Sequence, residues 1–93
     1  FKHYSPSKKL IINSIQPTKN CSFLGFGNIM PNNQFNGIAL NLSNDGNLNE
    51  AASNLFKMLR FLDKTETNEI VVAPIPNKDV GLAINDKLER ASS

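Results

Sequence analysis

The longest regular pattern of hydrophobic and polar positions spans residues 47–64 and predicts an amphipathic helix. Apolar side chains recur there with the i, i+3, i+4, i+7 spacing of one helix face, at Leu48, Ala51, Ala52, Leu55, Phe56, Leu59 and Leu62. Met58 and Phe61 lie beside this face and widen it, so we expect the helix to lie across a β-sheet. Asn47 can cap the helix, and Glu50 can return a hydrogen bond to the Asn47 N–H, which is the capping-box pattern.

Shorter apolar segments predict β-strands at residues 8–13, 21–26, 37–42 and 70–75. In the third segment, large apolar residues alternate with small ones, which leaves room for a helix to lie close on the small side. The fourth segment is apolar at almost every position, as is typical of a strand buried on both faces. Pro74 lacks an N–H, so we expect the end of this strand to lie at a sheet edge or beyond the ladder.

A second amphipathic helix is predicted over residues 80–91, with the apolar stripe Val80, Ile84, Leu88 and Ala91 and with Ala83 beside it. On its solvent side, Asp86 and Arg90 are spaced to form an i, i+4 ion pair. The third strand, the long helix and the fourth strand together make one βαβ unit. We expect its two strands to be parallel and its crossover to be right-handed.

The N-terminal half of the chain follows a different pattern. Segments 14–20 and 27–36 contain proline and are too short for a crossover helix, so the first two strands pair antiparallel or one of them is only an extended segment. These elements predict a small α/β domain of two or three layers. We expect about four strands, mostly parallel but mixed at the N-terminal side, and two main helices.

Composition narrows the function. The 93 residues are enough for one domain, and 40% of them are hydrophobic. A net charge of +2 is too small to indicate binding to nucleic acid or to a membrane. With one cysteine and no long apolar span, we expect no disulfide and a reducing, cytoplasmic setting. The chain begins at Phe1 rather than at methionine, so we expect it to be part of a longer protein.

Residues suited to catalysis are scarce. Gly25-x-Gly27 follows a predicted strand, but the third glycine and helix start of a dinucleotide-binding fingerprint are missing. His3 and Cys21 are each the only residue of their type, so neither has the partners that a metal site requires. Cys21 lies in an apolar run and reads as a core thiol. The polar face of the long helix pairs no two carboxylates and no nucleophile with a base. We therefore expect no catalytic residue and no metal.

One binding hypothesis comes from the βαβ pattern. The carboxyl ends of the third and fourth strands and the N-termini of both helices fall on the same side of the sheet, where ligands of parallel sheets collect. Helix N-termini attract anions. An anion site there would be lined by Ser43, Asn44, Asn77, Lys78 and Gly81. Ordinary helix capping accounts for the same residue types, and we favour it.

Three segments carry a family resemblance: FKHYSP at 1–6, ALNLSNDGNLNEAASNLFKMLRFLD at 39–63 and IVVAPIPNKDVGLAINDKLERAS at 70–92. Together they resemble the C-terminal domain of two-domain L-threonylcarbamoyladenylate synthase, the threonylcarbamoyl-AMP synthase of the YrdC-like family. The chain departs from the family pattern at Asn47, Val80, Leu82 and Lys87. The resemblance implies a Rossmann-like fold. Longer family members place a helix between the first two strands, and this chain has no room for one, so we do not expect a fully doubly wound sheet.

The resemblance also implies a function for the parent enzyme, a nucleotidyltransferase that makes threonylcarbamoyl-AMP from threonine, bicarbonate and ATP for the threonylcarbamoyladenosine modification of tRNA. ATP and Mg²⁺ would bind the catalytic domain, which is the expected partner, and the tRNA-modification machinery would be an indirect one. Residues 8–93 would be a non-catalytic accessory domain, and residues 1–7 an interdomain linker. The linker positions that inherit a role over the nucleotide pocket are His3, Tyr4, Ser5 and Pro6. Direct contact with tRNA is not indicated. The alternative is a stand-alone α/β module that binds a ligand or a protein.

Overall fold

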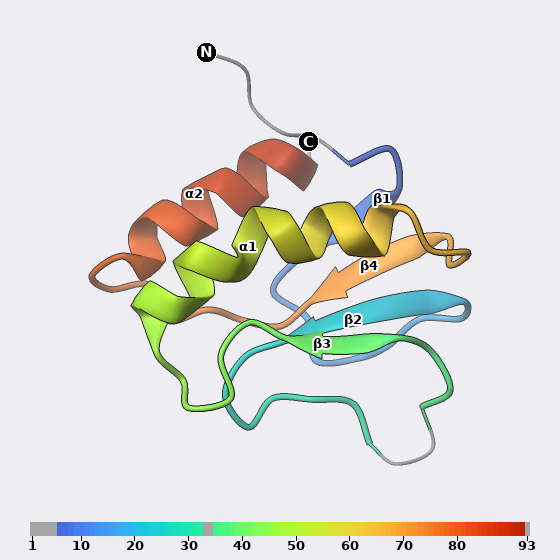
Figure 1. The fold of residues 1–93 in the computed structure, drawn as a ribbon, viewed down its shortest axis with the longest axis horizontal. Helices are drawn as coiled ribbons and strands as arrows, with labels where there is room; N and C mark the ends of the chain where they lie inside the picture. The colour runs from blue at the N-terminus through green and yellow to red at the C-terminus, as the bar shows by residue number, and fades with distance from the viewer. Residues whose placement is uncertain (1–5, 33–34, 93) are drawn as a thin grey trace.

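The computed structural model describes residues 6–32 and 35–92. Its elements, in chain order, are β1 (Lys9–Ile11), β2 (Cys21–Gly25), β3 (Ala39–Asn41), α1 (Leu48–Asp63), β4 (Glu69–Val72) and α2 (Gly81–Ser92). The strands form one four-stranded sheet, and both helices lie on the same face of it (Figure 1). The predicted α/β class, with four strands and two helices, is confirmed.

The order of the strands in the sheet is β1-β4-β2-β3, and every neighbouring pair is parallel. The predicted parallel relation of β3 and β4 is confirmed, although β2 lies between them. The expectation of mixed pairing at the N-terminal side is wrong. β1 does not pair with β2, because β4 is inserted between them and pairs with both. The connections 12–20 and 26–38 link these parallel strands, and their described residues form turns and loops rather than a helix.

The main core lies between the sheet and the two helices. Leu24, Ile70 and Val72 point from the strands toward Leu55 and Leu59 of α1, and all five side chains are buried. Successive residues of β4 point to opposite faces of the sheet, so that Val71 lies on the other side. The prediction that this strand is buried on both faces is confirmed, and β4 ends at Val72, before Pro74.

A smaller cluster covers the second face of the sheet. Cys21, Phe23 and Val71 are buried there, and Ile29 and Phe35 of the β2–β3 connection pack on them. In the part of the chain that the structure describes, this connection takes the place that a helix would have in a doubly wound sheet (Figure 1). The expectation of a core thiol at Cys21 is confirmed.

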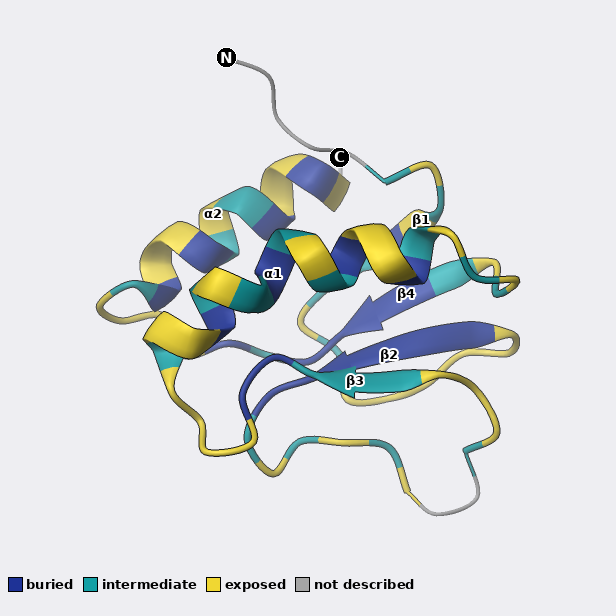
Figure 2. Ribbon diagram, in the orientation of Figure 1, coloured by how far each residue is buried: buried dark blue, intermediate teal, exposed yellow. Residues whose placement is uncertain are grey.

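The face of α1 that the pattern predicted is the face that is buried, which Figure 2 shows as a dark stripe toward the sheet. Its fully buried residues are Ala51, Leu55, Leu59 and Leu62. Met58 is partly buried against the core, as expected. Phe61 does not widen the face, because its position turns it to solvent, where 55% of its surface is exposed.

The caps of α1 are only partly as predicted. The Asn47 side chain accepts a hydrogen bond from the Glu50 N–H at 2.9 Å, so Asn47 is the N-cap. The reciprocal bond from the Glu50 side chain is absent. Ser43 Oγ accepts the Asn47 N–H instead, at 2.9 Å, because the loop before the helix folds this hydroxyl under the cap.

The second helix also follows its pattern closely. Ile84, Leu88 and Ala91 are buried against the sheet and α1, while Ala83 is exposed and does not extend the stripe. Asp86 and Arg90 form the predicted ion pair, with 3.1 Å between Oδ2 and Nε.

Candidate functional site

The carboxyl ends of the strands point toward the end of the molecule where both helices begin, as the βαβ pattern predicted (Figure 1). The two helix starts are in contact: a Cβ added to Gly81, the first residue of α2, would lie 3.4 Å from Cδ2 of Leu48, the first residue of α1. The five residues of the predicted anion site fall into two groups on this side, one at the start of each helix.

The first group is built around Ser43, which is 2% exposed. Its hydroxyl accepts the Asn47 N–H and donates to Glu50 Oε1 at 2.5 Å. Its N–H donates to Asn41 Oδ1 at 3.0 Å, and its carbonyl accepts the Gly27 N–H at 2.8 Å. The hydrogen-bonding groups of Ser43 are thus engaged within the chain. The carboxylate beside its hydroxyl opposes a bound anion.

The second group precedes α2. Gly81 donates its N–H to the carbonyl of Lys78 at 2.8 Å, and a Cβ at this position would lie 2.0 Å from the carbonyl oxygen of Pro76. Glycine is therefore required at residue 81 by close packing. The Asn77 side chain accepts a hydrogen bond from Asn85 at 3.3 Å, and Lys78 and Asn44 are exposed. These contacts are those of turns and caps, and the anion site stays a prediction.

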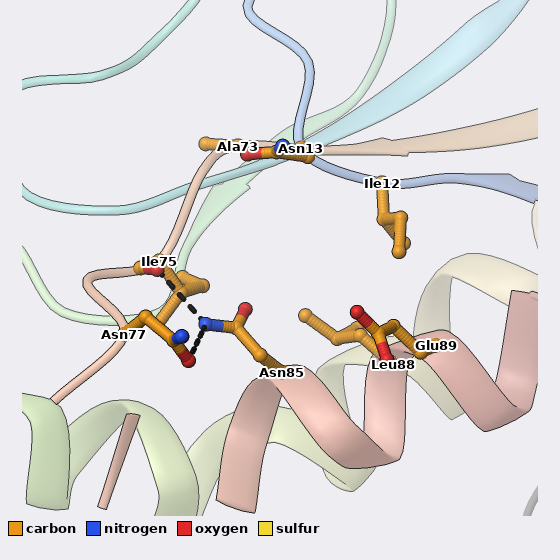
Figure 3. Close-up of a pocket in the computed structure, with 8 residues that line it drawn as sticks. All are labelled: Ile12, Asn13, Ala73, Ile75, Asn77, Asn85, Leu88 and Glu89. Atoms are coloured by element: carbon orange, nitrogen blue, oxygen red, sulfur yellow. Dashed lines mark hydrogen bonds between the residues drawn. The ribbon is translucent and has the colours of Figure 1, made fainter. Parts of the chain in front are cut away.

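A cavity of about 260 Å³ lies at the carboxyl ends of the strands, between the ends of β1 and β4 and one side of α2 (Figure 3). It is lined by Ile12, Asn13, Ala73, Ile75, Asn77, Asn85, Leu88 and Glu89. Four of these residues are apolar, and the others carry three amides and one carboxylate. The described residues that line the cavity include no lysine, arginine or histidine, so its chemistry suits a small neutral or cationic group better than a phosphate.

Asn85 is the polar side chain held most firmly in this cavity. Its amide nitrogen donates to the Ile75 carbonyl at 3.0 Å and to Asn77 Oδ1 at 3.3 Å, which fixes the orientation of the amide (Figure 3). Asn13, across the cavity, has a left-handed backbone conformation, with φ of 58°. Glu89 supplies the one ionisable group among the eight lining residues, and none of them carries a hydroxyl, thiol or imidazole that could act as a nucleophile beside it.

Sequence reasoning found only Asn77 among the lining residues. It missed Asn13 because the first strand was not recognised as parallel. It missed Asn85 and Glu89 because they are on α2, and the sequence does not show which side of this helix faces the ends of β1 and β4. Asn13 follows that strand directly, so a parallel β1 would have placed it at the same edge as Asn77.

Two further classes of function have no support in the described residues. Within 6–32 and 35–92, no group of three or more His, Cys, Asp and Glu side chains could hold a metal ion. Neither of the two helices described has both the length and the apolar content needed to span a membrane.

A family model described as threonylcarbamoyl-AMP synthase, C-terminal domain, matches residues 1–93 of the chain. The chain belongs to this family. The resemblance found in the sequence is thereby confirmed. A comparison with curated proteins found no match.

The predicted linker, residues 1–7, meets the rest of the chain just before β1. His3, Tyr4 and Ser5 of the predicted linker lie outside the described residues, and Pro6 is half-buried. Immediately after it, Ser7 donates a backbone hydrogen bond to Asp63 Oδ2, at the end of α1, at 3.1 Å. The last residue of the predicted linker is thus bonded to the domain.

The environment of Asp63 lowers the pKa of its carboxyl group. Partial burial acts to raise this pKa, but hydrogen bonds from the backbone N–H groups of Ser7 and Lys8 and from the Ser7 hydroxyl lower it, and the charge of Lys8 lowers it further. The net direction is downward, so the ionised carboxylate is the form that the fold stabilises.

Proposed function

We propose that this domain is the accessory, non-catalytic part of an enzyme that makes L-threonylcarbamoyl-AMP from L-threonine, bicarbonate and ATP for the threonylcarbamoyladenosine modification of tRNA. The family match over residues 1–93 is the observation that carries the proposal. In it, the domain supports or gates the catalytic domain, which is its direct partner. The tRNA-modification machinery receives the product in the cytoplasm, and the small net charge of +2 gives no reason to expect direct contact with tRNA.

The chemistry of the described residues supports the non-catalytic assignment. The cavity at the carboxyl edge offers amides and Glu89 but no base beside a nucleophile. Ser43 is buried beside the Glu50 carboxylate at the same end of the sheet. Its hydroxyl accepts the Asn47 N–H at the cap of α1 and donates to Glu50, so both of its bonds are made within the chain. The proposal therefore assigns ATP and Mg²⁺ to the catalytic domain.

The product explains why an accessory domain and linker would help. Threonylcarbamoyl-AMP is a mixed anhydride that water destroys, so a catalytic pocket gains from a segment that excludes water. We assign this role to His3, Tyr4, Ser5 and Pro6. Substitution of Tyr4 by alanine in the full-length synthase is then expected to lower turnover or to raise leakage of the product. The melting temperature of the domain is expected to stay the same.

The proposal is tested by measuring ATP consumption in the presence of threonine and bicarbonate. The purified 93-residue chain is expected to match a control without protein, while the synthase that carries the domain turns over. Turnover by the chain alone would overturn the non-catalytic assignment.

The cavity lined by Asn13 and Asn85 favours a second candidate, a stand-alone α/β module that binds a ligand or a protein. The gene sequence upstream of Phe1 separates the two candidates. A catalytic domain with a Lys-x-Arg…Ser-x-Asn signature there supports the synthase. A start codon at this position supports the stand-alone module.

A further inference from the structure

The last residue of α1 holds the beginning of the described chain. Asp63 Oδ2 accepts hydrogen bonds from the N–H and from the hydroxyl of Ser7, both at 3.1 Å, and Asp63 Oδ1 accepts the N–H of Lys8 at 3.1 Å. Both oxygens of one carboxylate thus bind two consecutive residues that lie more than fifty positions away in the sequence. Hydrogen bonds to an ionised acceptor are stronger than those between neutral groups.

The side chain of Lys8 also binds the end of α1. Lys8 Nζ donates to the carbonyl of Leu62 at 2.8 Å, to Thr65 Oγ1 at 3.0 Å and to the carbonyl of Thr65. The last carbonyls of a helix have no partner within the helix and carry its negative dipole end, so an ammonium group there is doubly favourable. We call this set of contacts, made by Ser7, Lys8, Leu62, Asp63 and Thr65, the linker clasp.

The electrostatics of the helix alone do not explain why an ionised carboxylate is stable at residue 63, in the last turn of α1. A carboxylate in the last turn of a helix is repelled by the negative end of the helix dipole. The donors of Ser7 and Lys8 offset this repulsion, which they can do only while both residues stay at the end of α1. A change of Asp63 is therefore mildly stabilising if the side chain is free, and loosens the start of the chain if the clasp forms.

The linker clasp lies directly before the first strand of the sheet. β1 begins at Lys9, one residue after the clasp, and it is an edge strand of three residues that pairs with β4 on one side only. Such a short edge strand is a weak anchor by itself. The clasp ties the residues ahead of it directly to α1, the longest helix of the domain.

We propose that Asp63 is a positioning residue that fixes the point and direction at which the linker joins this domain, by holding Ser7 and Lys8 against the end of α1. Ser7 and Lys8 then move with α1 as one rigid body, and the interdomain linker ends at Pro6 rather than at Ser7. The catalytic consequence rests on the proposed function, because it requires that the linker serve the catalytic domain. The structural part does not.

The structural part is tested by hydrogen exchange in the intact synthase, measured by mass spectrometry on the peptide that contains residues 7–11. The variant is Asp63→Asn, which keeps the shape of the side chain but places an NH₂ group against one of the N–H donors. The matched control is Asp86→Asn, the same change in an exposed ion pair of α2. We expect exchange in this peptide to become about tenfold faster in Asp63→Asn, while peptides from β2, β4 and α2 stay unchanged, and Asp86→Asn to have no effect.

Two results would overturn the proposal. If the peptide exchanges at the same rate in Asp63→Asn and in the control, the clasp does not hold the linker. If all peptides of the domain exchange faster together, Asp63 supports overall stability and does not position the linker. The second variant is Ser7→Ala, which removes the hydroxyl donor to Asp63 and leaves the sequence of α1 unchanged. We expect hydrogen exchange to become faster in the same peptide only, and by less than in Asp63→Asn.

The catalytic part is tested in the same samples by the amount of threonylcarbamoyl-AMP recovered for each pyrophosphate released. We expect this ratio to fall severalfold in Asp63→Asn and to stay unchanged in Asp86→Asn. An unchanged ratio together with faster exchange would overturn the link between clasp and catalysis. Turnover by the 93-residue chain alone would instead overturn the proposed function and leave the exchange result standing.

Discussion

Leu55 is the position where the packing of this domain is most open to a quantitative test. Its side chain is 1% exposed at the centre of α1, and it belongs to the same buried cluster as Leu24, Ile70 and Val72 of the sheet. One turn earlier on the same face is Ala51, whose side chain is too short to fill a gap. A Leu55→Ala substitution therefore leaves a cavity that the surroundings cannot close.

The expected loss follows from the full burial of Leu55. Leu→Ala changes at such sites cost about 2–5 kcal/mol, and the upper half of this range applies where the site cannot collapse. A domain of this length has a total stability of about 5–14 kcal/mol. With an m-value of about 1.5 kcal/mol/M, a loss of about 4 kcal/mol moves the urea midpoint by about 2.7 M.

The assay is a urea titration of the wild type, of Leu55→Ala and of a control variant, in which unfolding is monitored by circular dichroism. The control is Lys57→Ala, an exposed position two residues further along α1, where we expect a loss of about 0.5 kcal/mol or less. The m-values are expected to stay equal, since the surface exposed on unfolding hardly changes. Equal losses at Leu55 and Lys57 would show that the buried face of α1 has been assigned incorrectly.

Three further outcomes are expected. Ser43→Ala removes the acceptor of the Asn47 N–H and the donor to the Glu50 carboxylate, so we expect a loss of about 1–2 kcal/mol in the same titration, and no loss would leave Ser43 free for a ligand. Gly81→Ala drives a Cβ to 2.0 Å from a backbone carbonyl, and we expect a loss of about 1–3 kcal/mol; a neutral result would refute the close packing. The pKa of Asp63 is lowered in the folded state, so its contribution is complete above the ordinary aspartate pKa of about 4 and is lost as the pH falls through the folded pKa. As the pH is lowered from 6 to 2, the free energy of unfolding is therefore expected to fall more steeply in the wild type than in Asp63→Asn. Parallel curves of the free energy of unfolding against pH would contradict this.

The elements whose signals are local in the sequence could be predicted. The buried face of α1, its cap at Asn47 and the end of β4 before Pro74 each depend on residues a few positions apart. The apolar run at 70–75 was recognised as a strand buried on both faces because its composition leaves no polar side to face water.

The order of the strands could not be predicted in this way. The position of β4 between β1 and β2 is decided by which strands best cover the apolar faces of α1 and α2, a property of the assembled core. The error on β1 carried over to the cavity, because a strand assumed to be antiparallel or unpaired does not bring Asn13 to the edge where Asn77 lies.

The contacts made across long sequence separations had no signal at all. The Asp63 carboxylate meets Ser7 only because β1 runs parallel to β4 and so starts beside the end of α1. The same holds on a smaller scale for Ser43, whose hydroxyl takes the Asn47 N–H that the capping-box pattern had assigned to Glu50.

The most direct test of the accessory role is the yield of threonylcarbamoyl-AMP per ATP consumed by the synthase with and without residues 8–93. We expect the full-length enzyme to give a yield near one. We expect the truncated enzyme to consume ATP with a clearly lower yield or a lower rate, because the linker has lost the domain that holds it. The same yield and the same rate from both proteins would contradict the claim that this domain supports or gates the catalytic domain.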